Sequence, residues 1–133
     1  MICGSMFSGK TEELIRRIRR AEIAKMNTII FKPQIDDRYS SNHVVSHNQS
    51  KLASKLVKHS KEILDESSKM DVIGIDEAQF FDNGIVKVCK SLADNNKRVV
   101  VAGLDTDYLG KPFGPVPALM CEADYLDKLT AIC

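Results

Sequence analysis

A short segment near the start of the chain combines two glycines with a lysine and a threonine. Residues 4–11 read Gly-Ser-Met-Phe-Ser-Gly-Lys-Thr, which fits the P-loop pattern G-x-x-x-x-G-K-[ST]. In such a loop the backbone N–H groups wrap a phosphate, and the following helix adds positive potential. We therefore predict a nucleotide site in which Lys10 reaches the β/γ-phosphate oxygens and Thr11 ligates Mg²⁺. The predicted ligands are Gly4, Ser5, Met6, Phe7, Ser8, Gly9, Lys10 and Thr11. A chance glycine turn before a helix is the alternative.

Two adjacent carboxylates, Asp76 and Glu77, follow the apolar run 72–75. A P-loop site needs an acidic residue at the end of a neighbouring buried strand, where ligands of open α/β sheets bind. We predict that Asp76 binds the metal and that Glu77 accepts a proton, with Ala78 and Gln79 completing this nucleotide-binding segment. A solvated pair of carboxylates at a helix cap is the alternative.

Strands and helices must alternate to bring these two segments together. Short β-branched runs predict strands at 28–31, 72–75 and 99–104, while helical periodicity predicts helices at 10–25 and 84–94, the second with a possible cap at Asp82. This alternation predicts an α/β fold, in which a mostly parallel sheet carries helices on both faces. The polar stretch 33–54 is expected to be a long loop.

Composition favours a single cytoplasmic domain. The chain has 133 residues, and 19 Lys and Arg against 18 Asp and Glu leave a net charge of +1, so no global charge favours nucleic acid or membrane. Arg16, Arg17, Arg19 and Arg20 are interpreted as a solvated or subunit-facing helix surface. Four cysteines without close pairing indicate a reducing compartment, and no apolar run approaches the roughly 20 residues of a membrane span.

Several segments together resemble the type II thymidine kinases, whose P-loop NTPase core is RecA-like and carries a zinc-bearing lid. The resemblance covers nearly the whole chain and keeps the order of the family's motifs. It rests on 6–10 with 13–17, on Asp36-Asp37-Arg38-Tyr39, on 74–81, and on 103–105 with 111–114.

That resemblance implies a reaction and its participants. It implies ATP and Mg²⁺ as donor and metal, thymidine as acceptor, dTMP as product, and a homotetramer with dTTP as feedback inhibitor. It makes Glu77 the base for the 5′-hydroxyl and lets Arg38 neutralise phosphate charge. The matching base-pocket residues are Met6, Phe80, Leu104, Tyr108 and Phe113. Each of these alone is more often an ordinary core residue, so the set carries more weight than any single member.

The two ends of the sequence bear on the expected domain organisation. Only three residues precede the first glycine, fewer than the full strand expected before a P-loop, and the apolar run 129–133 ends without a closing element. By the resemblance, Cys133 would be one ligand of the lid's zinc. One thiolate cannot complete a tetrahedral structural site, so we expect residues 1–133 to be a kinase core and zinc to require the lid.

Other P-loop functions remain alternatives at this point. Residues 76–79 also fit the D-E-x-x box of helicase-type ATPases. Residues 107–110 fit a D-x-x-G pattern of GTPases, although 96–99 lack the aspartate of a guanine-reading motif. A non-catalytic nucleotide-binding module is a further possibility. Thymidine-dependent product formation would separate these hypotheses.

Overall fold

A computed structural model of the chain describes residues 1–6, 8–34, 43–45 and 51–130. Its main sheet has six parallel strands in the order β5-β2-β6-β7-β1-β8. The strands are β1 (Ile2–Gly4), β2 (Thr28–Pro33), β5 (Lys55–Val57), β6 (Val72–Ile75), β7 (Arg98–Leu104) and β8 (Asp127–Leu129). The predicted α/β class with a mostly parallel sheet is confirmed.

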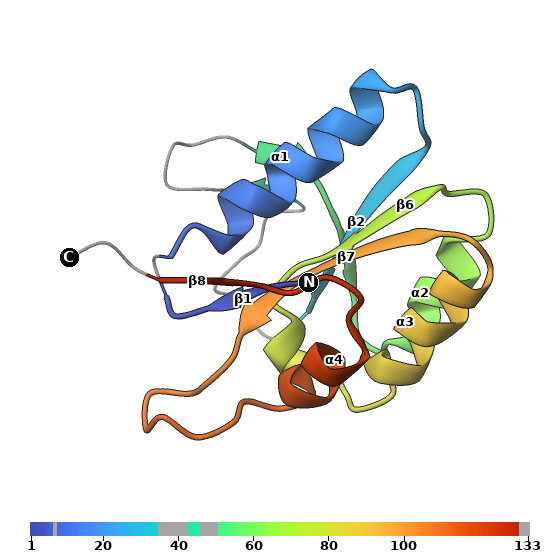
Figure 1. Cartoon of the computed structure of the whole chain (residues 1–133). Helices are drawn as coiled ribbons and strands as arrows, with labels where there is room; N and C mark the ends of the chain where they lie inside the picture. The colour runs from blue at the N-terminus through green and yellow to red at the C-terminus, as the bar shows by residue number, and fades with distance from the viewer. Residues whose placement is uncertain (7, 35–42, 46–50, 131–133) are drawn as a thin grey trace.

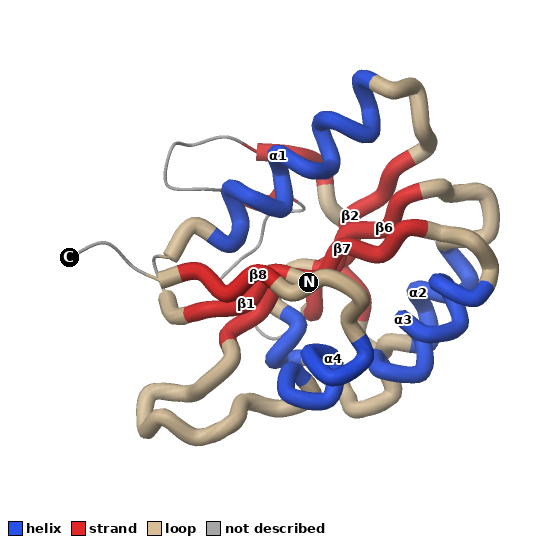
Figure 2. The backbone as a smooth tube through the Cα atoms, viewed as in Figure 1, coloured by secondary structure: helices blue, strands red, loops and turns tan. Residues whose placement is uncertain are grey.

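Helices cover both faces of this sheet (Figure 1). Helix α1 (Lys10–Ile23) lies on one face, and α2 (Lys61–Glu66), α3 (Ile85–Asp94) and α4 (Val116–Glu122) lie on the other, with the 3-10 turn η1 (Ala78–Phe80) after β6. Figure 2 shows the same layers as a backbone tube. A core lies on each face, because parallel strands between helix layers are apolar on both sides.

Helix α1 packs on the sheet through one apolar stripe. Leu14, Ile15, Ile18 and Ala21 are buried at helical spacing, while most of its arginines face solvent. A methyl group added at Gly74 would lie 3.2 Å from a terminal atom of Ile18 and 3.3 Å from one of Leu14. The missing side chain at Gly74 therefore lets α1 approach β6 closely.

The predicted elements differ from the observed ones at several boundaries. The strand expected at 28–31 continues to Pro33, the strand at 99–104 begins at Arg98, and the helix at 10–25 ends at Ile23. The cap predicted at Asp82 is wrong, because the N-cap residue of α3 is Gly84. The Asp82 carboxylate precedes the helix and accepts hydrogen bonds from the Ser60 amide and hydroxyl, at 2.8 and 2.7 Å, and from the Gly84 amide at 3.2 Å.

The stretch 33–54 was predicted to be one long loop, and this is wrong for its described part. An antiparallel hairpin forms there from β3 (His43–Val45) and β4 (Lys51–Ala53), and β5 follows directly. The alternation of polar and apolar residues in these three-residue strands is too short to stand out in the sequence.

Candidate functional site

The chain leaves the neighbouring strands β1 and β7 toward opposite faces of the sheet. Helix α1 follows β1 on one face, and α4 follows β7 on the other. In open α/β sheets a crevice opens outside the carboxyl ends of strands at such a switch point. Because β6 neighbours β7, the segments after β1, β6 and β7 meet at this edge.

The loop after β1 has backbone conformations at two positions that favour glycine. Gly4 and Gly9 have φ of 144° and 90°, in the region that favours glycine, and α1 begins at Lys10. A side chain at Gly4 would collide with the Leu129 carbonyl oxygen, 2.2 Å from the added carbon. The Lys10 ammonium turns back into the loop and donates to the Ser5 carbonyl oxygen.

Lys10 is surrounded by opposite charge. Burial lowers the pKa of its ammonium, and the carboxylates of Asp76, Glu77 and Asp105 act to raise it. These carboxylates follow β6 and β7, so the electrostatics agree with the strand order in bringing the predicted phosphate and metal segments together. A half-buried ammonium of this kind suits the charge of a phosphate group.

Asp76 and Glu77 differ in their surroundings although they are adjacent. Asp76 is only 6% exposed, and burial followed by the neighbouring Glu77 charge raises its pKa to about 6. Glu77 is partly exposed and has φ 56° and ψ 42°, a left-handed conformation that costs a non-glycine residue roughly 1–2 kcal/mol. Strain of this kind concentrates at functional sites, where the surrounding structure enforces it.

We expect Asp76→Asn to stabilise the metal-free protein at neutral pH. The raised pKa means that Asp76 stabilises the fold relative to the unfolded chain below about pH 4, and that this contribution is lost as pH rises through about 6. The variant should therefore unfold with a free energy about 1–3 kcal/mol higher at pH 8 in EDTA, and the difference should vanish near pH 4.

Urea denaturation at the two pH values measures this difference. Asp65→Asn, which neutralises an exposed carboxylate on α2, is the matched control and should leave the free energy of unfolding nearly unchanged at both. A destabilised Asp76→Asn protein at pH 8 would contradict the expected cost of ionising this buried group.

Only some of the predicted base-pocket residues are in contact with one another. The Phe80 and Phe113 rings meet edge to face, with centroids 5.5 Å apart and planes at 86°. The Leu104 N–H donates to Oε1 of Gln79, the residue before Phe80, at 3.0 Å. These contacts place an aromatic pair beside the end of β7. The side chains of Met6 and Tyr108 are 62% and 94% exposed, and their assignment to the pocket stays a prediction.

The remaining predicted residues fall into two groups. Ser5 is exposed, and Ser8 and Thr11 are partly exposed within the loop and the first turn of α1. Ala78 and Gln79 are buried behind the site, so Gln79 holds the end of β7 through its side chain. Phe7, Arg38 and Cys133 lie outside the described residues.

Sequence reasoning assigned no role to Asp105 and Lys128, which also belong to this edge. Lys128 Nζ lies 2.9 Å from Asp105 Oδ2. A carboxylate directly after an apolar strand was the signal that identified Asp76, and the same signal is present at Asp105. The partner Lys128 has no comparable signal, because β8 is short and its pairing with β1 joins the two ends of the sequence.

The oxygen donors at this edge fit Mg²⁺ bound with a nucleotide. Among the described residues, no three His, Cys, Asp or Glu side chains form a group that could hold a metal ion. Mg²⁺ is typically held by one or two carboxylates together with waters and substrate phosphates. The Asp76 carboxylate and the Thr11 hydroxyl match that requirement.

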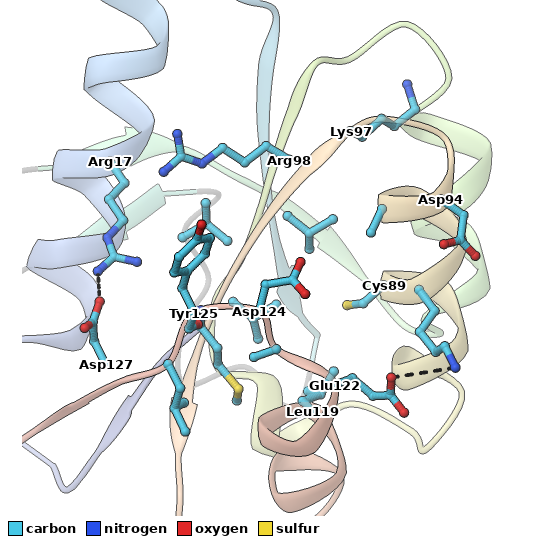
Figure 3. Close-up of a pocket in the computed structure, with 18 of the residues that line it drawn as sticks. Arg17, Cys89, Asp94, Lys97, Arg98, Leu119, Glu122, Asp124, Tyr125 and Asp127 are labelled. Atoms are coloured by element: carbon cyan, nitrogen blue, oxygen red, sulfur yellow. Dashed lines mark hydrogen bonds and ion pairs between the residues drawn. The ribbon is translucent and has the colours of Figure 1, made fainter.

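A large hollow elsewhere in the molecule has a different character (Figure 3). It lies beside residues 98–101, in the amino-terminal half of β7, and between α1, α3 and α4. Two of its cations are paired with lining carboxylates: Arg17 with Asp127, and Lys90, which lies 3.6 Å from Glu122. The hollow lies beside the amino-terminal half of β7, whereas the predicted phosphate and metal segments follow the carboxyl ends of β1 and β6.

The strand order and the glycine loop opening into α1 define an α/β protein of the P-loop type. The thymidine kinase family model matches residues 1–133. The thymidine kinases of Bacteroides fragilis and Rhodothermus sp. are each 56% identical to the chain over all 133 residues, which make up 67% and 62% of those proteins. The chain belongs to the thymidine kinase family and spans about two thirds of the length of these relatives.

Membership of this family places the chain among transferases, and not among helicases or GTPases. The aspartate of residues 107–110 stabilises a local turn: the Asp107 carboxylate accepts hydrogen bonds from the Leu109 and Lys111 amides, at 2.8 and 3.0 Å. Within the described ranges, no helix is long and apolar enough to cross a membrane.

Proposed function

We propose that the protein transfers the γ-phosphate of ATP to the 5′-hydroxyl of thymidine, giving dTMP. The observation that carries the proposal is the convergence of the P-loop lysine with Asp76 and Glu77 at one sheet edge, where Lys10 experiences both carboxylates. Membership of the thymidine kinase family supports the choice of acceptor.

Each residue has a separate role in this proposal. The loop N–H groups and Lys10 hold the donor phosphates, while Thr11 and Asp76 hold Mg²⁺. When bound, Mg²⁺ neutralises phosphate charge as it shifts toward the leaving group. Glu77 accepts the proton of the 5′-hydroxyl, a role that its greater exposure allows. Arg38, by the resemblance, balances further phosphate charge.

The nucleoside lies against the aromatic pair in this proposal. Phe80 and Phe113 offer flat apolar surface for a pyrimidine ring, with Met6, Leu104 and Tyr108 as further contacts. By the same resemblance, we place a zinc-bearing lid, dTTP inhibition, a homotetramer and a cytoplasmic location in the complete enzyme. In this proposal the lid lies in the part of the relatives' length that the chain does not span.

A coupled assay tests the proposed reaction. ADP release is followed with and without thymidine, and dTMP is identified by mass spectrometry, for residues 1–133 and for a form extended to the relatives' length. We expect thymidine-dependent dTMP from the extended form and little from residues 1–133, because a lid excludes water and completes the reacting geometry.

The outcomes separate the alternatives. ADP release that does not depend on thymidine would indicate an ATPase. ATP binding without turnover in either form would indicate a nucleotide-binding module. Full activity of residues 1–133 would show that the acceptor site is complete without the lid.

A further inference from the structure

The Asp105–Lys128 ion pair spans three strands at the edge that carries the phosphate loop. Asp105 follows β7, and Lys128 is on β8, opposite Cys3 of the intervening strand β1. Lys128 Nζ reaches across β1 to within 2.9 Å of Asp105 Oδ2. The other carboxylate oxygen accepts the Thr106 N–H at 3.0 Å. Asp105 is only 9% exposed, so its negative charge is largely withdrawn from water.

This carboxylate lies close to the loop lysine. Leu104 is in register with Gly4, so Asp105 is level with Ser5, whose carbonyl oxygen accepts the Lys10 ammonium. The Asp105 charge accordingly acts on Lys10. Burial favours a raised pKa for Asp105, but Lys128 and the backbone N–H groups outweigh burial and hold the pKa below its usual value.

We propose that Lys128 is a charge-balancing residue of the nucleotide site: it neutralises Asp105 so that Lys10 and the metal remain available to the donor triphosphate. This inference rests on the proposed function, in which the loop binds ATP. Lys128 acts through Asp105 and need not touch the substrate.

The physical argument concerns an unpaired carboxylate at this position. Without Lys128, Asp105 would keep a poorly solvated charge beside the loop, where it would attract the Lys10 ammonium and repel the phosphates. One uncompensated charge at a partly solvated edge is expected to change Mg·ATP affinity by roughly tenfold. In the alternative, a mechanical clamp, the contact between Asp105 and Lys128 only holds β7, β1 and β8 together. Loss of either residue would then weaken the site, and removing both charges would not restore it.

A double-mutant cycle distinguishes charge balance from a clamp. Mg·ATP affinity is measured by titration calorimetry for Lys128→Gln, Asp105→Asn and the double variant. We expect about tenfold weaker binding for Lys128→Gln, a change of less than about threefold for Asp105→Asn, and recovery to within about threefold of the parent protein in the double variant. Lys128→Arg should bind almost normally, and Lys87→Gln, on the exposed face of α3, is the control.

Several results would overturn the proposal. Equal loss of affinity in all three variants would indicate a clamp, and unchanged affinity in Lys128→Gln would show that Asp105 does not affect the site. If Lys128→Gln fails to fold, Asp105→Asn alone decides, since a loss of about tenfold or more in that variant contradicts charge balance. A different result would contradict the proposed function itself: Mg·ATP affinity that does not change when Lys10 is replaced.

Discussion

Replacing Glu77 by glutamine should lower kcat for thymidine phosphorylation by about 10²- to 10⁴-fold, the range for loss of a general base. Glutamine keeps the size of the side chain and an acceptor oxygen but cannot take the 5′-hydroxyl proton. ATP affinity should change much less, because Glu77 is not assigned to the phosphates. The left-handed backbone at residue 77 is retained, since glutamine adopts it at a similar cost.

Steady-state kinetics on the extended enzyme, with both substrates varied, measure this effect. Glu22→Gln, which neutralises an exposed carboxylate at the end of α1, is the control and should retain the parent kcat. Near-normal turnover of Glu77→Gln at saturating thymidine and ATP would place the base elsewhere.

Substitution of the neighbouring carboxylate, Asp76, should have a different kinetic effect. Asp76→Asn is expected to raise the Mg²⁺ concentration needed for half-maximal activity, because an amide is a weaker ligand than a carboxylate. The two variants thus separate proton acceptance from metal binding in adjacent residues. That separation follows from their surroundings, since Asp76 is buried directly after β6, whereas Glu77 is partly exposed and has a left-handed backbone.

The sequence predicted those parts of the site that depend on short-range pattern. The glycine loop opening into α1 and the carboxylates after β6 were both found, because each motif is contiguous and lies next to a strongly patterned element. The sheet class followed from the same alternation. Boundaries moved by one or two residues where tertiary pairing extended a strand, as at Pro33, which pairs with Val57 of β5.

Features created by long-range pairing could not be predicted. Strand β8 has three residues, two of them charged and exposed, and exists because it pairs with β1 at the other end of the sequence. The Asp105–Lys128 pair depends on that same pairing. Helices α2 and α4 are six and seven residues long, too short for helical periodicity to stand out.

Lys10→Ala should weaken Mg·ATP binding by roughly 10²-fold. A charge-assisted hydrogen bond contributes about 1.5–3 kcal/mol, or roughly ten- to 150-fold in affinity. The upper part of that range is expected here, because removing the ammonium also leaves the carboxylates of Asp76 and Glu77 near the phosphates without the compensating charge of Lys10.

Titration calorimetry of Mg·ATP into the protein measures the loss, with thermal unfolding as a check that the loop variant is folded. Lys87→Ala removes an equal charge from the exposed face of α3 and should bind as the parent protein does. Lys10→Arg should recover only part of the affinity, because a planar guanidinium cannot replace a compact ammonium that turns back onto the Ser5 carbonyl oxygen. Unchanged affinity in Lys10→Ala would remove the phosphate site from this loop, and with it the basis for assigning Asp76 and Glu77 to the metal and the proton.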